Sequence, residues 1–172
     1  MKAIKVILII ISIISVGFFA TGFIMPETKY QTSIEINKNI DGVFQSFSDI
    51  KNSKDWVPGL KSVGIRKEVP NKIGSVYELI AIDRGAEITI VQKITAFKKN
   101  ESIGISFRAN EMNKLNLFKF EGKGNSTILT LDATCKSDSY MLSCIFPYFK
   151  GFFKEQDDVY LQNFKSYIES KS

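Results

Sequence analysis

The final stretch of the sequence, residues 147–169, constrains the fold more strongly than any other segment. Its apolar residues recur every three or four positions between polar ones, as on a helix with one wet and one dry face. The apolar positions are Phe149, Phe153, Tyr160, Leu161, Phe164 and Ile168. At ~1.5 Å per residue this helix extends ~35 Å, and Pro147 suits its first position. It is long enough to cross a small domain, either as a packed core helix or as the cover of a cavity.

The middle of the chain alternates between polar and apolar residues, which is the pattern of β-strands. Residues 29–37 form the first predicted strand, and residues 40–47 form a short helix with Val43, Phe44 and Phe47 on its dry face. Six more strands are predicted at residues 61–68, 75–83, 86–98, 102–109, 115–122 and 127–136. The breaks between these strands are short and contain turn-forming residues, so we expect hairpins and an antiparallel meander.

The order of predicted elements indicates the α+β class. An antiparallel sheet of about seven strands twists and curls, and the long C-terminal helix packs across its concave face. A single helix that grips a curled sheet from one side leaves the middle of the fold hard to fill with side chains. We therefore expect a cavity between the sheet and the helix.

Aromatic and aliphatic side chains on the strand and helix faces are the candidates for the wall of this cavity. They are apolar, and the tyrosines add a polar group, as ligand sites require. The predicted ligand-binding residues are Tyr77, Leu79, Phe107, Phe118, Phe120, Phe149, Phe153 and Tyr160. Each of them also suits an ordinary packed core, so an open cavity and a filled one both remain as interpretations.

The segment IEINKNIDGVFQSFSDIKNSKDWVPG resembles the opening of the START-like superfamily, which includes the birch-pollen-allergen-like proteins and is also labelled SRPBCC or polyketide cyclase. The motifs that carry the resemblance are Ile36-Asn37, Val43-Phe44, Asp49, Trp56-Val57-Pro58, Gly74, Leu161, Phe164-Lys165 and Glu169. The resemblance covers residues 30–170, and its motifs are structural. Lys38-Asn39 departs from the family's usual Ala-Pro, which puts the start of the first short helix in doubt.

The resemblance implies a helix-grip fold with a hydrophobic pocket between the sheet and the C-terminal helix. Members bind lipids, sterols, polyketides or other apolar molecules, and some are cyclases or aromatases. An activity does not transfer with a fold, so the resemblance leaves catalysis open.

An enzyme of this fold would need an acid–base group directed into the cavity. The candidates are Glu78, Asp83, Arg84, Glu87, Arg108, Asp132 and Asp157. Glu78 points to water if the face of Tyr77 and Leu79 is the inner one, and into the cavity if it is the outer one. Asp157 lies on the dry side of the C-terminal helix, where it pairs with a cation of the sheet, caps the pocket or sits beside the apolar stripe. No two candidates have a spacing that requires catalysis, so we assign no catalytic residue.

The N-terminal segment is predicted to enter a membrane. Lys2 and Lys5 precede an uncharged apolar run at residues 6–25, and a helix of this length spans ~30 Å, the thickness of a bilayer core. Positive charge before the run favours an N-terminus in the cytoplasm and a domain outside. The layout is similar to that of a bacterial subgroup of the superfamily, which implies a single pass through the bacterial cytoplasmic membrane.

A cleavable signal peptide is the alternative, with cleavage near Gly22 and a secreted or periplasmic product. In either case the chain divides into an anchor or signal segment at residues 1–28 and a helix-grip domain at residues 29–172.

The composition excludes several other functions. The sequence contains no His, which excludes Ser-His-Asp and Cys-His nucleophile systems and most zinc sites. Cys135 and Cys144 have no metal-ligand spacing, and they either form a disulfide or are two small buried residues. The net charge of +5 is spread thinly, without the basic patches that bind nucleic acid. We expect no cofactor, no metal and no nucleic-acid partner, and the sequence leaves the oligomeric state open.

The sequence therefore favours a membrane-tethered, non-catalytic module that binds a lipid or another hydrophobic small molecule. An enzyme that uses a pocket carboxylate such as Glu78, and a fully packed domain that contacts another protein, are the alternatives.

Overall fold

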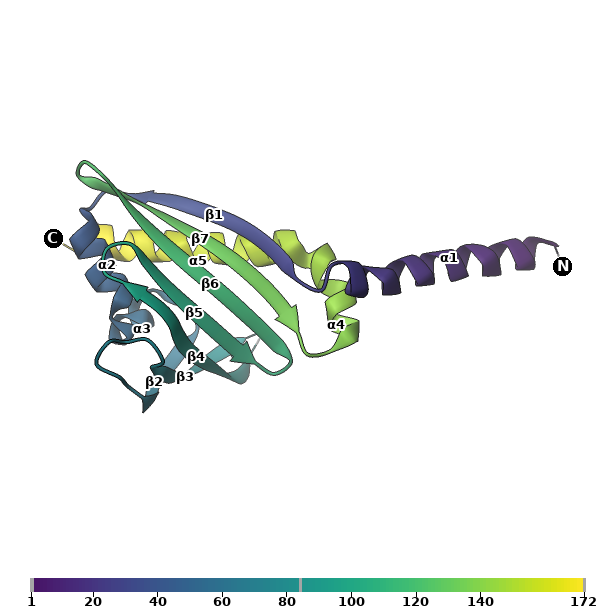
Figure 1. Ribbon diagram of the computed structural model, residues 1–172, viewed down its shortest axis with the longest axis horizontal. Helices are drawn as coiled ribbons and strands as arrows, with labels where there is room; N and C mark the ends of the chain where they lie inside the picture. The colour runs from purple at the N-terminus through teal and green to yellow at the C-terminus, as the bar shows by residue number, and fades with distance from the viewer. Residues whose placement is uncertain (1, 84, 172) are drawn as a thin grey trace.

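The computed structural model describes residues 2–83 and 85–171, and their elements follow the predicted order (Figure 1). The helices are α1 (Lys2–Ile24), α2 (Ile40–Ser48), α3 (Ser53–Trp56), α4 (Tyr140–Ile145) and α5 (Lys150–Ser170), with 3-10 turns η1 (Ile50–Asn52) and η2 (Phe146–Phe149). The strands are β1 (Thr28–Ile36), β2 (Leu60–Lys67), β3 (Val76–Asp83), β4 (Ala86–Lys98), β5 (Ser102–Ala109), β6 (Met112–Lys123) and β7 (Ser126–Ser137). The predicted bounds of β4 and β5 are confirmed to the residue.

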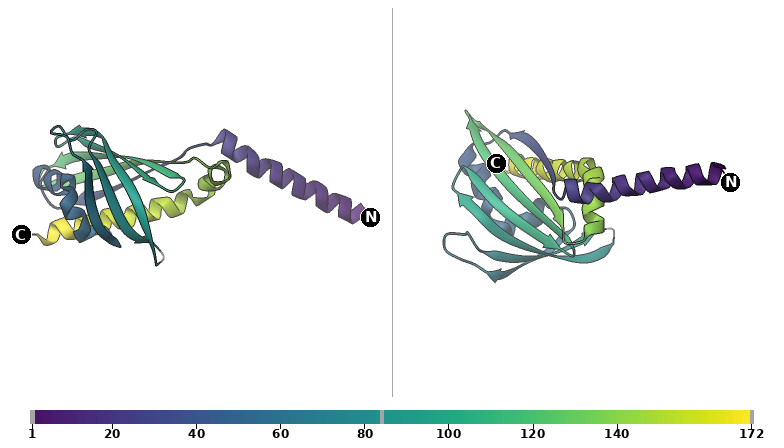
Figure 2. Two further views of the ribbon diagram at one scale, coloured as in Figure 1. Left: turned by 90° about the horizontal axis from the view of Figure 1, so that it is seen from below. Right: turned by 45° about the vertical axis from the view of Figure 1, so that its right-hand side comes forward.

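The strands form one antiparallel sheet in the order β1-β7-β6-β5-β4-β3-β2. Consecutive strands from β2 to β7 are neighbours, and β1 pairs with β7 over its whole length, from Thr28 opposite Cys135 to Ile36 opposite Thr127. The sheet curls, and α5 runs along its inner side (Figures 1 and 2). The α+β helix-grip architecture with seven strands is thus confirmed.

The C-terminal helix begins later than predicted. We expected a helix from Pro147, but Phe146–Phe149 form the 3-10 turn η2 with the proline at its start, and α5 begins at Lys150. Proline lacks the N–H that a continuous helix requires and its ring crowds the preceding turn, so the chain bends here. The short helix α4, before this bend, was not predicted.

Helix α2 begins as the sequence predicts, despite the departure from the family motif. The side chain of Asn39 accepts a hydrogen bond from the backbone N–H of Gly42 at 2.9 Å, which caps the free end of the helix. Val43, Phe44 and Phe47 are buried against the sheet side of the core.

An aromatic cluster lies beneath β6. The ring of Phe47 lies 4.6 Å from that of Phe118 and 5.0 Å from that of Phe164, and Phe44 lies 5.1 Å from Phe120. Trp56 closes the cluster at 5.1 Å from Phe164. Helices α2, α3 and α5 and the sheet therefore meet at one end of the fold.

Helix α1 projects away from the rest of the molecule (Figure 2). It is long and apolar enough to cross a membrane, and its most apolar window is not buried by the remainder of the chain. Among the described residues, the hydrophobic core cluster includes members from Tyr30 to Ile168 and none from α1.

Candidate functional site: a cavity between the sheet and α5

A cavity of about 370 Å³ lies between the curled sheet and α5. Its walls come from the inner faces of β3, β4, β5 and β6, from the segment around α3, and from one side of α5. The wall residues are mostly aliphatic and aromatic, which gives the cavity the size and character of a small-molecule site.

Five of the eight predicted ligand-binding residues line this cavity, namely Tyr77, Leu79, Phe107, Phe118 and Tyr160. The strand residues do so because their alternation faces inward: Tyr77 and Leu79 are buried, and Phe107 is partly buried on the same face of β5 as Ile105. Whether these side chains bind a ligand remains a prediction.

The other three predicted residues do not line the cavity. Phe120 is buried, but the rings of Phe44 and Phe47 pack against it at 5.1 and 5.5 Å and fill the space in front of it. Phe149 belongs to η2 rather than to α5 and is half exposed. Phe153 packs at 5.2 Å against Phe146 at the end of the fold near α4. The bend at Pro147 turns the first part of the predicted apolar stripe away from the cavity.

Several wall residues were missed because the prediction concentrated on aromatic side chains. They include Ile88, Ile90, Gln92, Ile94 and Asn116. The signal was present on β4, where the period-two alternation puts every second residue from Ile88 to Ile94 on one face. This face could have been assigned to the cavity with the same reasoning as that of β3.

Two polar amides lie within the apolar wall. Gln92 and Asn116 are 5% and 4% exposed. Among the described residues, the Asn116 Oδ1 atom is buried without a hydrogen-bond partner, and so is the Nε1 atom of Trp56. A buried polar atom left unpaired costs about 1–3 kcal/mol, so such atoms are suited to meet a partner that enters the cavity.

A buried ionic cluster sits at one side of the cavity. The Asp157 carboxylate on α5 accepts from Lys114 Nζ on β6 at 2.5 Å and from the Tyr30 hydroxyl on β1 at 2.8 Å. Asp157 is 2% exposed, and both it and Lys114 line the cavity. Of the arrangements considered for Asp157, pairing with a cation of the sheet is therefore the one observed.

The surroundings of this cluster favour the protonated forms of Tyr30 and Cys135. Burial, with the Asp157 carboxylate and Cys135 as further causes, raises the pKa of the Tyr30 phenol well above its usual value of 10.0. Burial also raises the pKa of the Cys135 thiol. Both oxygens of Asp157 are occupied, and its strongest neighbours are a phenol and an ammonium group. This arrangement joins β1, β6 and β7 to α5.

The remaining acid–base candidates face outward and pair on the surface. Glu78 pairs with Arg66, Glu87 with Lys61, and Asp132 with Lys119. The hydrogen bonds from Lys119 and Gln31 lower the pKa of Asp132. Glu78 follows the solvent-facing alternative, because the face of Tyr77 and Leu79 is the inner one. The Asp83 side chain and Arg84 lie outside the described residues.

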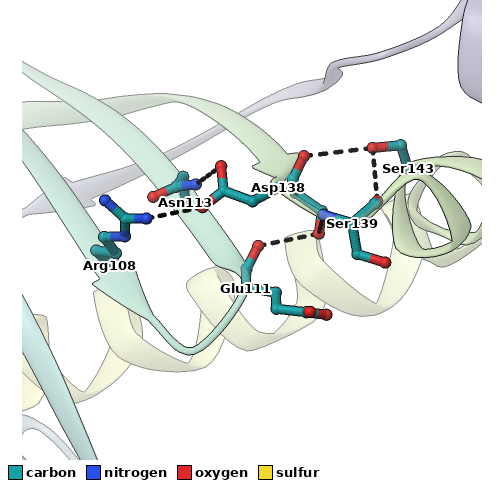
Figure 3. Close-up of polar contacts among 7 residues, drawn as sticks. Arg108, Glu111, Asn113, Asp138, Ser139 and Ser143 are labelled. Carbon is teal, nitrogen blue, oxygen red and sulfur yellow. Dashed lines mark hydrogen bonds and ion pairs between the residues drawn. The ribbon is translucent and has the colours of Figure 1, made fainter.

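Arg108 also points away from the cavity, as its alternation with Phe107 predicts. Its guanidinium donates to Asp138 at 2.9 Å, and Asn113 donates to the other oxygen of the same carboxylate at 2.9 Å (Figure 3). These contacts join the β5–β6 hairpin to the segment that leads into α4, and they serve structure rather than ligand binding.

The two cysteines are free and buried, so the disulfide alternative is not observed. Cys135 faces Tyr30, with 3.9 Å between its Sγ and the hydroxyl, whereas Cys144 lies on α4 against Phe19 of α1. Among the described residues, no group of three or more His, Cys, Asp or Glu side chains is arranged to hold a metal ion.

The curled seven-stranded sheet around a long C-terminal helix is a helix-grip fold, and known structures share it. The chain is similar to the Zhui aromatase/cyclase from Streptomyces sp. R1128, with a TM-score of 0.71, 12% identity, and coverage of 83% of this chain and 94% of that one. It is also similar to a START superfamily protein from Mycobacterium smegmatis, with a TM-score of 0.69, 14% identity, and coverage of 84% and 99%. A protein from Thermus thermophilus has a TM-score of 0.70 at 10% identity over 84% and 99%.

These identities are low, so the similarities establish the fold alone. No protein-family model matches the sequence, and no curated protein matches it.

Proposed function

We propose that this chain is a membrane-tethered domain that binds a lipid or another hydrophobic small molecule in the cavity between the sheet and α5. The observation that carries the proposal is the cavity itself, about 370 Å³ of space in a fold whose other half is densely packed. Empty apolar space of this size forfeits dispersion contacts and burial, so a ligand that fills it would restore them.

The polar wall atoms narrow the chemistry of the ligand. An apolar body would contact residues such as Ile90 and Ile105, and one or more hydroxyl or carbonyl groups would meet Asn116 and Trp56 Nε1. A hydroxyl group both donates and accepts, so it can pair with either atom. A fully saturated hydrocarbon would leave both atoms unpaired.

Helix α1 supports the tether. Its 23 residues begin with the segment that holds Lys2 and Lys5, contain no acidic residue, and from Val6 on are uncharged and mostly exposed. We propose that it crosses the bacterial cytoplasmic membrane once, with the N-terminus in the cytoplasm and residues 29–172 outside. Cleavage of a signal peptide would instead release the domain, and the mass of the protein purified from cells separates these two cases.

An enzyme remains the second candidate because the similar structures include an aromatase/cyclase and a di-domain ARO/CYC protein. The residues of this chain give it less support. Among the described wall residues Asp157 is the one carboxylate, and both of its oxygens are engaged. Glu78, on which the enzyme interpretation relied, is not part of the wall.

Native mass spectrometry of residues 27–172, purified from cells without detergent, tests ligand binding directly. This segment retains the whole core cluster, to which none of the described residues of α1 belongs. We expect a discrete apolar adduct, or uptake of one from a panel of fatty acids, sterols and phenols. A clean apo mass with no uptake would contradict the proposal.

A pair of substitutions on β3 provides the control. Ala81→Phe places an aromatic ring in the cavity and should abolish uptake, whereas Ile80→Phe makes a comparable change on the opposite face of the same strand and should leave it intact. Equal uptake by both variants would place the ligand elsewhere.

A further inference from the structure

The end of the fold next to α1 carries a group of exposed apolar side chains. They are Tyr140 and Met141 of α4, Tyr148 and Phe149 of η2, and Phe152 of α5, with exposed fractions of 53, 51, 63, 50 and 42%. We call these five residues the apolar foot. Large aromatic side chains gathered at one end of a fold mark a surface that another phase or molecule covers.

Helix α1 packs directly against this foot. The Tyr140 hydroxyl donates to the carbonyl of Phe19 at 2.6 Å, and the ring of Tyr148 stacks on Phe18 at 6.2 Å. Gly22 is buried against Cys144, and a Cβ at this position would come within 2.5 Å of the Cys144 sulfur, so glycine is what allows this approach. The position of the foot relative to α1 is therefore fixed by contacts.

The other side of α4 is fastened to the sheet. Asp138, just before α4, accepts hydrogen bonds from Arg108 and Asn113 (Figure 3). The Ser143 hydroxyl on α4 donates to the carbonyl of Ser137, the last residue of β7, at 3.4 Å. The Ser137 hydroxyl donates to the Glu111 carbonyl in the β5–β6 turn at 2.9 Å. Three residues, 25–27, separate α1 from β1. The connection between α1 and β1 is thus short, and contacts on both sides of α4 hold α1 against the domain.

The length of α1 sets the depth of the foot. Measured from the first uncharged residue, Val6, the contact residues Phe18 to Gly22 lie ~18 to ~24 Å along the helix. A bilayer core is ~30 Å thick, so these contacts fall in the outer part of the apolar layer. Helix α4 lies against this end of α1 (Figure 1), which puts it near the boundary between acyl chains and headgroups.

The chemistry of the segment suits this boundary. Residues 139–154 contain no acidic residue and include Lys150 and Lys154. Tyrosine is enriched at membrane interfaces, where its ring and hydroxyl meet apolar and polar layers, and lysines near the surface are attracted by anionic lipids.

We propose that the apolar foot inserts into the outer interfacial layer of the same bilayer that α1 crosses, so that the domain is held against the membrane in one orientation. The inference rests on the proposed membrane tether, and the partner is the lipid surface. It adds a second membrane contact, made by the folded domain itself, and it places the cavity a fixed distance from the lipid.

Quenching of tryptophan fluorescence by brominated phosphatidylcholine tests this with the full chain in vesicles that include anionic lipid. Trp56, the single native Trp, supplies a constant background, and each variant adds one more. Phe149→Trp reports on the foot and Ile11→Trp on the middle of α1. Ile65→Trp is the matched control, because this side chain is as exposed, at 55%, but lies on β2 away from α1.

We expect lipid brominated near the headgroup end of its acyl chains to remove most of the added emission of Phe149→Trp. Bromine within the acyl chains should do the same for Ile11→Trp, which lies ~8 Å along α1 from Val6. The emission added by Ile65→Trp should be unchanged. Quenching of Ile11→Trp without quenching of Phe149→Trp would overturn the inference while leaving the tether intact. Absence of quenching in both would overturn the tether and, with it, the foot. Ligand uptake by residues 27–172 is measured separately and bears on neither outcome.

Discussion

The two halves of the grip are built from the same alternating strands yet differ in how they are filled. Where α2 and the last three turns of α5 meet the sheet, Phe120 and Phe164 pack against the ring of Phe47, which, like that of Phe118, also borders the cavity. Beneath β3, β4 and β5, the inward residues face the cavity instead. Strand alternation therefore decides which side chains point inward, and the element opposite decides whether they find a partner.

The residues of the opposite element explain the difference. On α5, Phe164 and Ile168 are buried toward the packed half. Toward the cavity the same helix presents Gln156, Asp157, Tyr160 and Leu161. The Asp157 carboxylate is held by Lys114 and Tyr30, so it does not fill the apolar space beside it. We call Tyr30, Lys114 and Asp157 the seam, because they lie between the packed half and the hollow half.

The largest expected effect comes from removing a ring in the packed half. Phe164→Ala should lower the free energy of unfolding by about 3–5 kcal/mol, because Phe164 is fully buried and its neighbours cannot collapse into the space. Phe107→Ala makes the same change on the cavity wall, where the ring is only partly buried, and should cost less than about 2 kcal/mol. Urea unfolding of residues 27–172, followed by circular dichroism, measures both. Equal losses would show that the hollow half is packed in solution.

The next largest expected loss of stability comes from breaking the buried ion pair between Lys114 and Asp157. Lys114→Met leaves Asp157 buried without its cation, and breaking a buried pair in this way costs about 3–5 kcal/mol. Because the Lys114 side chain is 16% exposed, we expect the lower end of this range, about 3 kcal/mol.

Lys154→Met is the matched control for this prediction. It breaks the exposed pair with Asp158 on the same helix, which is worth less than about 1 kcal/mol. The same unfolding measurement applies. A loss below about 1 kcal/mol for Lys114→Met would mean that Asp157 is not held by this ion pair.

Much of the fold could be predicted from the sequence because its signals are local. The alternation of apolar and polar residues gave the bounds of β4 and β5. Asn39 caps α2 although the family's Ala-Pro is missing, because an asparagine side chain can accept a hydrogen bond from the first turn of a helix. For β3 the alternation separated Tyr77 and Leu79 from Glu78 but left the inner face open, and the structure buries Tyr77 and Leu79. These decisions depend on neighbours within a few residues.

The errors lie where a distant partner decides the outcome. Phe120 has the same alternation as Phe118, but the rings of α2 occupy the space before it. Phe149 and Phe153 match the helical spacing of α5, but the bend at Pro147 carries them toward α4. The hydrogen bond between Tyr30 and Asp157 joins residues 127 positions apart. The sequence indicated a cavity and most of its inward faces, whereas the boundary between filled and empty space required the structure.

The smallest effect concerns the pH dependence of the seam. Burial and Asp157 raise the pKa of Tyr30, so above its ordinary pKa of 10.0 the unfolded chain loses this proton while the folded chain keeps it. The unfolded state then binds fewer protons than the folded state. The stability from this group is fully present below pH 10, and above it falls by about 1.4 kcal/mol for each pH unit.

Tyr30→Phe removes this pH dependence. At neutral pH it should be less stable by about 1–3 kcal/mol because Asp157 loses a buried donor, and the gap to the wild type should narrow above the ordinary tyrosine pKa. Tyr148→Phe, an exposed tyrosine, is the control, and the titrations of the other tyrosines and of the lysines cancel in the comparison. The difference in the free energy of unfolding between the wild type and Tyr30→Phe could instead stay constant above pH 10. That result would show that Tyr30 ionises as freely in the folded protein as in the unfolded chain, and that water reaches the Tyr30–Asp157 contact.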